Sequence, residues 1–247
     1  MKKIIMILLI GLIIQSCKKQ ESTQKALSSL TLVNTSIDIV GLKLNTSGLI
    51  QSWSGIPAGN VTNFANSKHY GVFVGTRSVT VTVAADSTKT LYSASQEFKE
   101  GAFNTLFLCG QTGSYEGVYL TDENLPNYTE EVVSIRFINL SPNSPAVSIN
   151  LTATPAVNEA ANLVYKQKSE FKTYPAGNVA AGIAFQVKNA VTGSLLASYT
   201  LPAAAVSPYT TATVAQARFK NVTLVIKGLA GTTTGTNAFG VFPVAHY

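Results

Sequence analysis

The chain is poor in charged side chains. Only 12% of its 247 residues are Asp, Glu, Lys or Arg, and the formal net charge is +6. Most of that excess comes from lysines within the first 25 residues. Residues 28–126 carry five basic and seven acidic side chains, and residues 127–247 carry eight basic and four acidic ones. Neither half has the basic stripe that neutralises a phosphate backbone, which argues against nucleic acid as a partner.

Histidine and cysteine are also scarce, with two of each. His69 and His246 are far apart in sequence and have no cysteine beside them, so the spacing of a zinc site is missing and no metal is predicted. His246 is the penultimate residue, and we expect it to be solvated. A catalytic triad would need one of these histidines together with an aspartate (Asp38, Asp86 or Asp122), and no G-x-S-x-G elbow accompanies them.

Paired carboxylates of the kind that hydrolyse glycosides occur as Glu97 with Glu100 and Glu130 with Glu131. Both pairs lie in polar segments, where solvated charges are the ordinary explanation. The sequence therefore predicts no catalytic residue, no enzyme activity and no cofactor.

A long hydrophobic run is missing, because Ile4–Ile14 is shorter than the about 20 residues of a membrane-spanning helix. With Met1-Lys2-Lys3 before it, this run is typical of a signal peptide. Ile14-Gln15-Ser16-Cys17 resembles a lipobox, with a small residue before the cysteine. We predict a signal peptide at residues 1–16, a diacylglycerol and acyl (palmitate) anchor on Cys17 in the outer membrane, and a flexible tether at 17–26.

Once Cys17 is acylated, Cys109 has no partner for an intramolecular disulfide. It falls at the end of a predicted strand, and we expect a partly buried free thiol.

The chain has a single tryptophan, Trp53, within the turn-rich connection Asn45–Asn66. An exposed Trp53 is a possible ligand contact that stacks on a sugar ring. A tryptophan folded back over a sandwich edge is the commoner arrangement, and the sequence leaves both open.

What the chain does contain is strand sequence. Apolar side chains alternate at Val133, Ile135 and Phe137, and this period of two is typical of a half-buried strand with Ser134 and Arg136 on its polar face. A Pro/Asn/Ser turn follows at residues 141–145, and a second strand is predicted at Val147–Leu151.

The same pattern occurs earlier in the chain. A shift of 105 residues places Leu30 on Ile135, Asn34 on Asn139 and Ser36 on Ser141 without a gap. Later segments match with other offsets, including 104–113 with 222–231 and 117–119 with 240–242. Matching blocks in the same order indicate that one domain of about 100 residues is duplicated.

The segments R-F-I-N-L-S-P, A-V-S-I-N-L, Y-P-A-G and N-V-T-L-V-I-K-G-L resemble the bacterial domain of unknown function numbered 4397. The resemblance is strongest over Val132–Gly231 and weaker over Leu30–Leu120, where the proline after the serine is lost. It implies a secreted protein or lipoprotein built of tandem immunoglobulin-like β-sandwiches, and it supplies no catalytic residues.

Short strands punctuated by Gly, Pro and Asn predict an all-β chain of two tandem immunoglobulin-like sandwiches. The predicted domains are residues 27–126, the divergent copy, and residues 127–247. Expected strands of the second copy include Leu163–Tyr165 and Tyr209–Val214.

The leading functional prediction is a non-enzymatic, lipid-anchored cell-envelope protein, a binding or adhesion module for glycan or protein. The alternative is a structural subunit of a surface assembly, fimbria-like or part of a surface layer. Families of lipidated pilins are cut after an arginine to open a strand-acceptor groove, and here the first arginine, Arg77, lies inside the first domain, which disfavours that alternative.

Overall fold

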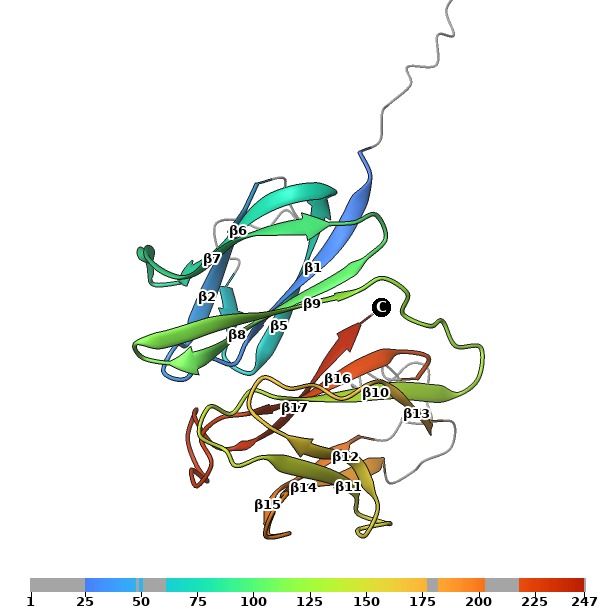
Figure 1. Cartoon of the computed structure of the whole chain (residues 1–247). Helices are drawn as coiled ribbons and strands as arrows, with labels where there is room; N and C mark the ends of the chain where they lie inside the picture. Colours follow the sequence, from blue (N-terminus) through green and yellow to red (C-terminus); the bar gives the residue numbers. More distant parts are fainter. Residues whose placement is uncertain (1–24, 48, 51–60, 177–181, 203–217, 247) are drawn as a thin grey trace, which may run out of the picture.

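The computed structural model of the chain describes residues 25–47, 49–50, 61–176, 182–202 and 218–246. Every regular element in these residues is a β-strand (Figure 1), which confirms the predicted all-β class. Strands up to Asp122 form two sheets, and strands from Val132 onward form two others. The strands of the first pair of sheets are β1 (Leu27–Asn34), β2 (Gly41–Thr46), β3 (Leu49–Ile50), β4 (Val61–Asn63), β5 (Asn66–Phe73), β6 (Gly75–Val83), β7 (Asp86–Phe98), β8 (Phe103–Gln111) and β9 (Ser114–Asp122). Those of the second pair are β10 (Val132–Asn139), β11 (Val147–Leu151), β12 (Asn158–Leu163), β13 (Lys172–Pro175), β14 (Ile183–Asn189), β15 (Leu195–Leu201), β16 (Asn221–Lys227) and β17 (Gly240–His246).

The first sandwich packs a sheet of order β3-β5-β1-β8-β9 on a sheet of order β4-β2-β6-β7. Alternating apolar residues of these strands face one another, because a strand points successive side chains to opposite faces. The buried members of this core are Leu30, Leu32, Leu42, Tyr70, Val72, Val79, Val81, Phe98, Leu106 and Leu108.

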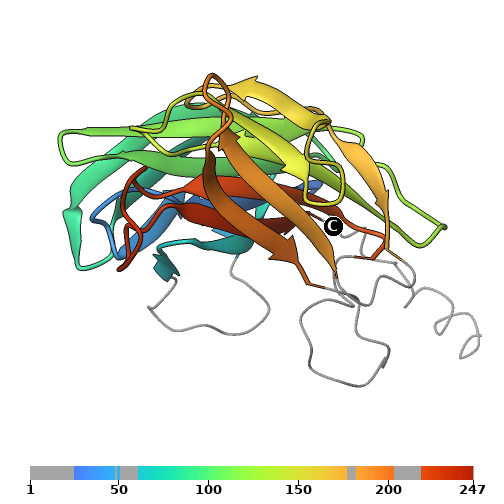
Figure 2. The same ribbon diagram turned by 90° about the horizontal axis from the view of Figure 1, so that it is seen from below.

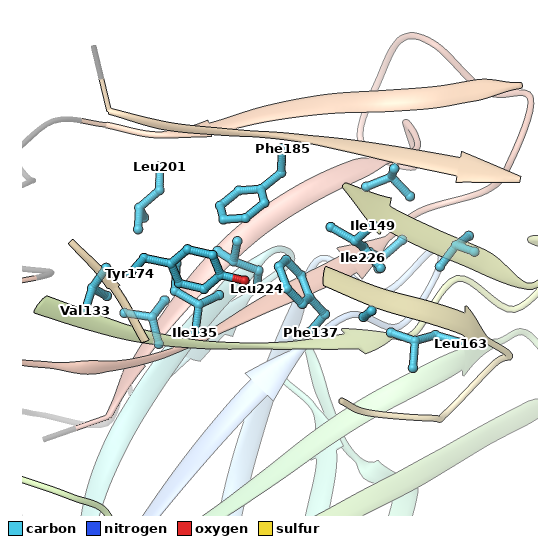
Figure 3. Packing of buried hydrophobic residues seen from close by; sticks show 14 of the residues in the cluster. Val133, Ile135, Phe137, Ile149, Leu163, Tyr174, Phe185, Leu201, Leu224 and Ile226 are labelled. Carbon is cyan, nitrogen blue, oxygen red and sulfur yellow. The ribbon is translucent and has the colours of Figure 1, made fainter. Parts of the chain in front are cut away.

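The second sandwich packs a sheet of order β13-β10-β16-β17 on one of order β12-β11-β14-β15. Its core is centred on aromatic rings that point into the space between the sheets (Figure 3). Phe185 meets Phe137 edge-to-face at 5.3 Å between ring centroids and meets Tyr174 at 5.7 Å. Such contacts add to the hydrophobic stabilisation of a core.

The two sandwiches have the same strand order once β3 is set aside, with β1, β2 and β4–β9 corresponding to β10–β17. Each contains one parallel pair, β1 with β8 and β10 with β16. The registers also agree, since Leu30 lies opposite Asn104 and Ile135 lies opposite Val222. This register is the one expected from the sequence alignment.

The asparagine shared by the two copies has a structural role. The Nδ2 atom of Asn34 donates to the carbonyls of Ile39 and Thr62, and its Oδ1 accepts from the backbone and hydroxyl of Ser36. Asn139 repeats the arrangement, with Leu163 O and the Ser141 amide as partners. Both side chains are fully buried, and their hydrogen bonds close the turns that follow β1 and β10. Because partners within the protein satisfy both asparagines, no ligand is needed to explain the Asn-x-Ser pattern.

The sheet β3-β5-β1-β8-β9 of the first sandwich packs face to face with the sheet β13-β10-β16-β17 of the second, as Figure 1 shows. We call these two the inner sheets. A third apolar cluster joins Val33, Phe107 and Cys109 to residues of the second sandwich, namely Ile138, Leu140, Val225 and Val244. Figure 2 views the molecule from below, and there β14 and β15 of the second sandwich's other sheet lie in front of β16 and β17. The strands β1, β8, β10 and β16 are consequently buried on both faces, and the predicted half-buried β10 is wrong in this respect.

Two details of the strand prediction differ from the structure. The connection expected at Asn45–Asn66 contains β3 and β4, and β12 occupies Asn158–Leu163 in place of Leu163–Tyr165. The strand expected at Tyr209–Val214 lies outside the described residues. None of the described residues forms a helix with the length and apolar character that crossing a bilayer requires.

Candidate functional site

An apolar pocket opens at one edge of the second sandwich. It has a volume of about 480 Å³, a size typical of ligand pockets. Three segments form its walls: the end of β11 with the turn after it, the end of β13, and the start of β14. Its lining residues are Leu151, Thr152, Ala153, Tyr174, Pro175, Gly182, Ile183 and Ala184. With Thr152 and the tyrosine hydroxyl as its side-chain polar groups, the pocket suits an apolar group better than a sugar.

A buried carboxylate fixes the wall that β13 contributes. Glu159 on β12 accepts a hydrogen bond from the Tyr174 hydroxyl at 2.8 Å and pairs with Lys172 at 2.6 Å. Its side chain is only 4% exposed. Burial and this carboxylate both raise the pKa of Tyr174, so the phenol stays protonated as a donor. β13 is therefore held firmly against β12.

A buried polar cluster lies between the two sandwiches. Arg136 on β10 forms a two-pronged ion pair with Asp122 at the end of β9, with both N–O distances 2.8 Å. The Arg136 side chain is 1% exposed, and its guanidinium stacks on the Phe171 ring at 4.5 Å. Its Nε donates to Thr223 Oγ1, which lies 2.7 Å from Nε2 of His246. The prediction that Arg136 faces solvent is wrong, because the first sandwich covers that face of β10.

His246 is 3% exposed, so the predicted solvated histidine is wrong as well. Burial and then the charge of Arg136 lower the pKa of His246 to about 4. Since Arg136 already donates to Thr223 Oγ1, the hydroxyl proton of Thr223 can point at Nε2 of a neutral imidazole.

The cluster does not have the geometry of a catalytic triad. The Asp122 carboxylate binds a guanidinium, and it does not orient an imidazole ring. His69 on β5 contacts a different hydroxyl, Thr31 Oγ1, at 2.8 Å, and its pKa is lowered by burial and by Lys220. Each histidine thus forms a hydrogen bond with a threonine hydroxyl on a neighbouring strand.

Unfolding should become easier in mild acid because of His246. The unfolded chain binds a proton on this ring from about pH 6.5 downward, whereas the folded protein binds it only near pH 4. The contribution of neutral His246 to the free energy of unfolding is therefore fully present above pH 6.5, and the free energy of unfolding falls by about 3 kcal/mol as the pH drops to 4. Urea unfolding at both pH values, compared with the His246→Gln variant, measures this loss. An equal loss in the variant would assign it to other groups.

Cys109 is fully buried between the sandwiches, where a partly buried thiol was expected. Burial raises the pKa of its thiol to about 11, and Sγ lies 3.5 Å from the carbonyl oxygen of Glu116. Because the thiolate is the reactive form, we expect iodoacetamide at pH 8 to leave Cys109 unmodified in the folded protein. Mass spectrometry should detect alkylation only after urea is added, and rapid labelling without urea would contradict the burial.

The paired carboxylates considered above are not brought together as an acid and a base. Glu97 on β7 and Glu100 in the following turn are exposed, and so are Glu130 and Glu131. Glu131 pairs with Arg218 at 2.7 Å. Within the described part of the chain, no group of three or more His, Cys, Asp or Glu side chains could hold a metal ion.

Residues 29–150 match the model of a family described as a domain of unknown function (DUF4397). The match supports membership of the DUF4397 family. The matched range contains the first sandwich from the third residue of β1 through β9, and then β10 and most of β11. The first sandwich, whose sequence resembles the family less strongly, is thus covered by the match almost completely.

Other comparisons add little. No curated protein matches the chain. Among solved structures, a streptococcal protein described under "Alpha-glucan recognition by family 41 carbohydrate-binding modules" is 11% identical. That likeness covers 81% of this chain and 93% of the other, with a TM-score of 0.25. A second streptococcal protein, described under "Alpha-glucan binding by a streptococcal virulence factor", is 8% identical over 80% of this chain and 93% of its own, with a TM-score of 0.23. TM-scores this low carry no argument about function.

Two residues singled out from the sequence lie outside the described residues. They are the predicted lipidation site, Cys17, and the possible ligand contact, Trp53. Both stay predictions. The pocket beside β13 was not foreseen, because it depends on the length of a connection and not on a motif.

Proposed function

We propose that the chain is a non-enzymatic, lipid-anchored protein of the cell envelope, and that its second sandwich binds a protein partner. The observation that carries the proposal is the apolar pocket in that sandwich, bounded by the firmly held strand β13. A pocket lined by aliphatic carbon favours an apolar side chain of a protein. Glycan capture rests on Trp53 alone.

The position of the first strand fits such a role. The predicted anchor at Cys17 is joined by residues 17–26 to the start of β1 at Leu27. That end of β1 lies on the side of the first sandwich that points away from the second (Figure 1). An anchor there leaves the second sandwich, with its pocket, as the part farther from the membrane.

A non-enzymatic role is supported by how the chain uses its few reactive groups. The two histidines bind threonine hydroxyls, and the partly buried Asp122 pairs with Arg136. Each of these groups is satisfied by a structural partner and faces another strand. None of them lines the pocket.

Membrane fractionation tests the anchor. Each buried CH₂ contributes about 0.8 kcal/mol, so two or three acyl chains on Cys17 should hold the protein in the membrane fraction. Cys17→Ala should move it to the soluble fraction or leave it unprocessed. Ser16→Ala, which keeps a small residue before the cysteine, should behave as the wild type. Soluble wild-type protein would refute the anchor.

The alternative function, a subunit of a surface assembly, is favoured by one observation. β13 is an edge strand that has one strand partner, β10, among the described residues. Exposed edges of this kind let chains associate by strand addition. Analytical ultracentrifugation of the purified mature protein distinguishes the two functions, since an assembly subunit should form oligomers that grow with concentration.

A further inference from the structure

The two sandwiches differ at one sheet edge, which an additional strand covers in the first sandwich and which is the end of the sheet in the second. In the first sandwich, β3 pairs with the outer side of β5, placing Leu49 opposite Val72 and Ile50 opposite Gly71. In the second sandwich the strand equivalent to β5 is β13. The matching registers make Tyr174 the counterpart of Val72 and Thr173 the counterpart of Gly71. In the part of the chain that the structure describes, no strand pairs with this outer side of β13.

The difference follows from the length of one connection. Residues 47–60 separate β2 from β4 and include β3, whereas only residues 152–157 separate β11 from β12. The shorter connection forms a turn, with Thr154 N bonded to Leu151 O and Val157 N bonded to Thr154 O. It has no residues to spare for a strand that would cover β13.

The pocket lies where this strand is missing. Two of its lining residues, Thr152 and Ala153, belong to the short connection, and two others, Tyr174 and Pro175, belong to β13. The edge that β3 covers in the first sandwich is thus bordered by an open apolar cavity in the second.

The backbone of β13 can accept another strand. The amide of Ala176 donates to Glu131 O at 2.7 Å, toward the chain that leads into β10. Because backbone groups alternate in direction along a strand, the N–H and C=O of Thr173 face the opposite way. Glu159, bonded to Tyr174 and Lys172, holds β13 in place before any partner arrives. A strand that is already ordered loses little entropy on binding.

We propose that a strand from a separate protein pairs with the outer edge of β13 and inserts an apolar side chain into the pocket, as an intermolecular counterpart of β3. This inference deepens the proposed function, on which it rests, by naming the binding surface and the chemistry of the partner. Main-chain hydrogen bonds to Thr173 supply affinity, and the aliphatic pocket selects Leu- or Ile-like side chains.

The chain itself provides a probe for the test. A fluorescent peptide with the sequence of residues 46–52, which contains the Leu49-Ile50 pair of β3, should bind the purified protein saturably in a polarisation assay. A control peptide with serine at both positions should not. Ala153→Trp places an indole in the pocket and should weaken binding at least about tenfold. Ala156→Trp, in the same exposed connection but outside the pocket lining, is the matched control and should bind as the wild type.

Hydrogen exchange supplies an independent readout. The Thr173 amide should exchange rapidly in the free protein and become protected when the peptide is added. Absence of saturable binding, equal binding by Ala153→Trp, or a protected Thr173 amide in the free protein would each overturn the inference. A protected amide would mean that the chain covers its own edge. Membrane fractionation is unaffected by any of these results, so failure of the strand-binding site is distinguishable from failure of the anchor.

Discussion

Replacing Arg136 with alanine is expected to destabilise the folded protein by about 3–5 kcal/mol, the largest single loss that the structure predicts. The substitution leaves Asp122 beside the apolar interface without its two 2.8 Å partners, and it removes the donor to Thr223. It also removes the guanidinium that stacks on Phe171. Urea unfolding followed by circular dichroism measures the change.

A double-mutant cycle shows how much of that loss belongs to the ion pair. Asp122→Ala alone should also be costly, since it leaves a buried guanidinium unpaired. The double variant should lose less than the sum of the two single variants, because neither charge then remains buried alone. Lys99 with Glu123 offers a matched surface pair, about half exposed, for which Lys99→Ala should cost far less than Arg136→Ala because solvent screens the pair. Similar losses for Arg136→Ala and Lys99→Ala would contradict a buried interface between the sandwiches.

Gly228→Ala is expected to cost about 3–4 kcal/mol. Gly228 has a φ of +82°, and a Cβ atom built on it would lie 2.2 Å from the carbonyl oxygen of Ala238. Its counterpart in the first copy, Gly110, has a φ of +93° and would place a Cβ 2.1 Å from the oxygen of Ser114. Both glycines are therefore required where the β8–β9 and β16–β17 hairpins begin.

Gly231 separates steric clash from backbone strain. Its φ is +90°, but nothing lies within 4 Å of a Cβ at that position. Gly231→Ala should thus cost only the strain of the left-handed backbone, about 1–2 kcal/mol. Thermal melts of the two variants provide the comparison. Equal shifts in Tm would mean that the close approach to Ala238 does not matter.

Much of the fold was accessible from local sequence. The alternation around Ile135 and the turn before Val147 predicted β10 and β11, because period-two patterning and turn chemistry act within a few residues. The sequence alignment also carried structural information. Its offset of 105 places β1 on β10, its match of 104–113 with 222–231 places β8 on β16, and together they reproduce the register of each parallel pair.

The polar residues between the sandwiches were misjudged for one physical reason. Alternation shows which face of a strand is apolar, but it does not show what covers the other face. Arg136 and His246 were assigned to solvent, and the packing of one inner sheet on the other buries both. Only their partners, Asp122 and Thr223, make such burial tolerable, and those contacts join residues distant in sequence.

The candidate site was inaccessible for a different reason. The open edge at β13 follows from the six-residue segment 152–157 being too short to supply the strand that residues 47–60 supply in the first copy. A loop length has meaning only when the topology of both copies is known. The sequence had drawn attention to Trp53 in the longer connection instead.

The measurement that tests the central claim most directly is the mass of the N-terminal peptide of the protein isolated from cell membranes. A lipid-anchored envelope protein should begin at Cys17 and carry the added mass of a diacylglycerol and an acyl chain on that residue. A membrane-derived chain that begins elsewhere, or that carries an unmodified Cys17, would contradict the account.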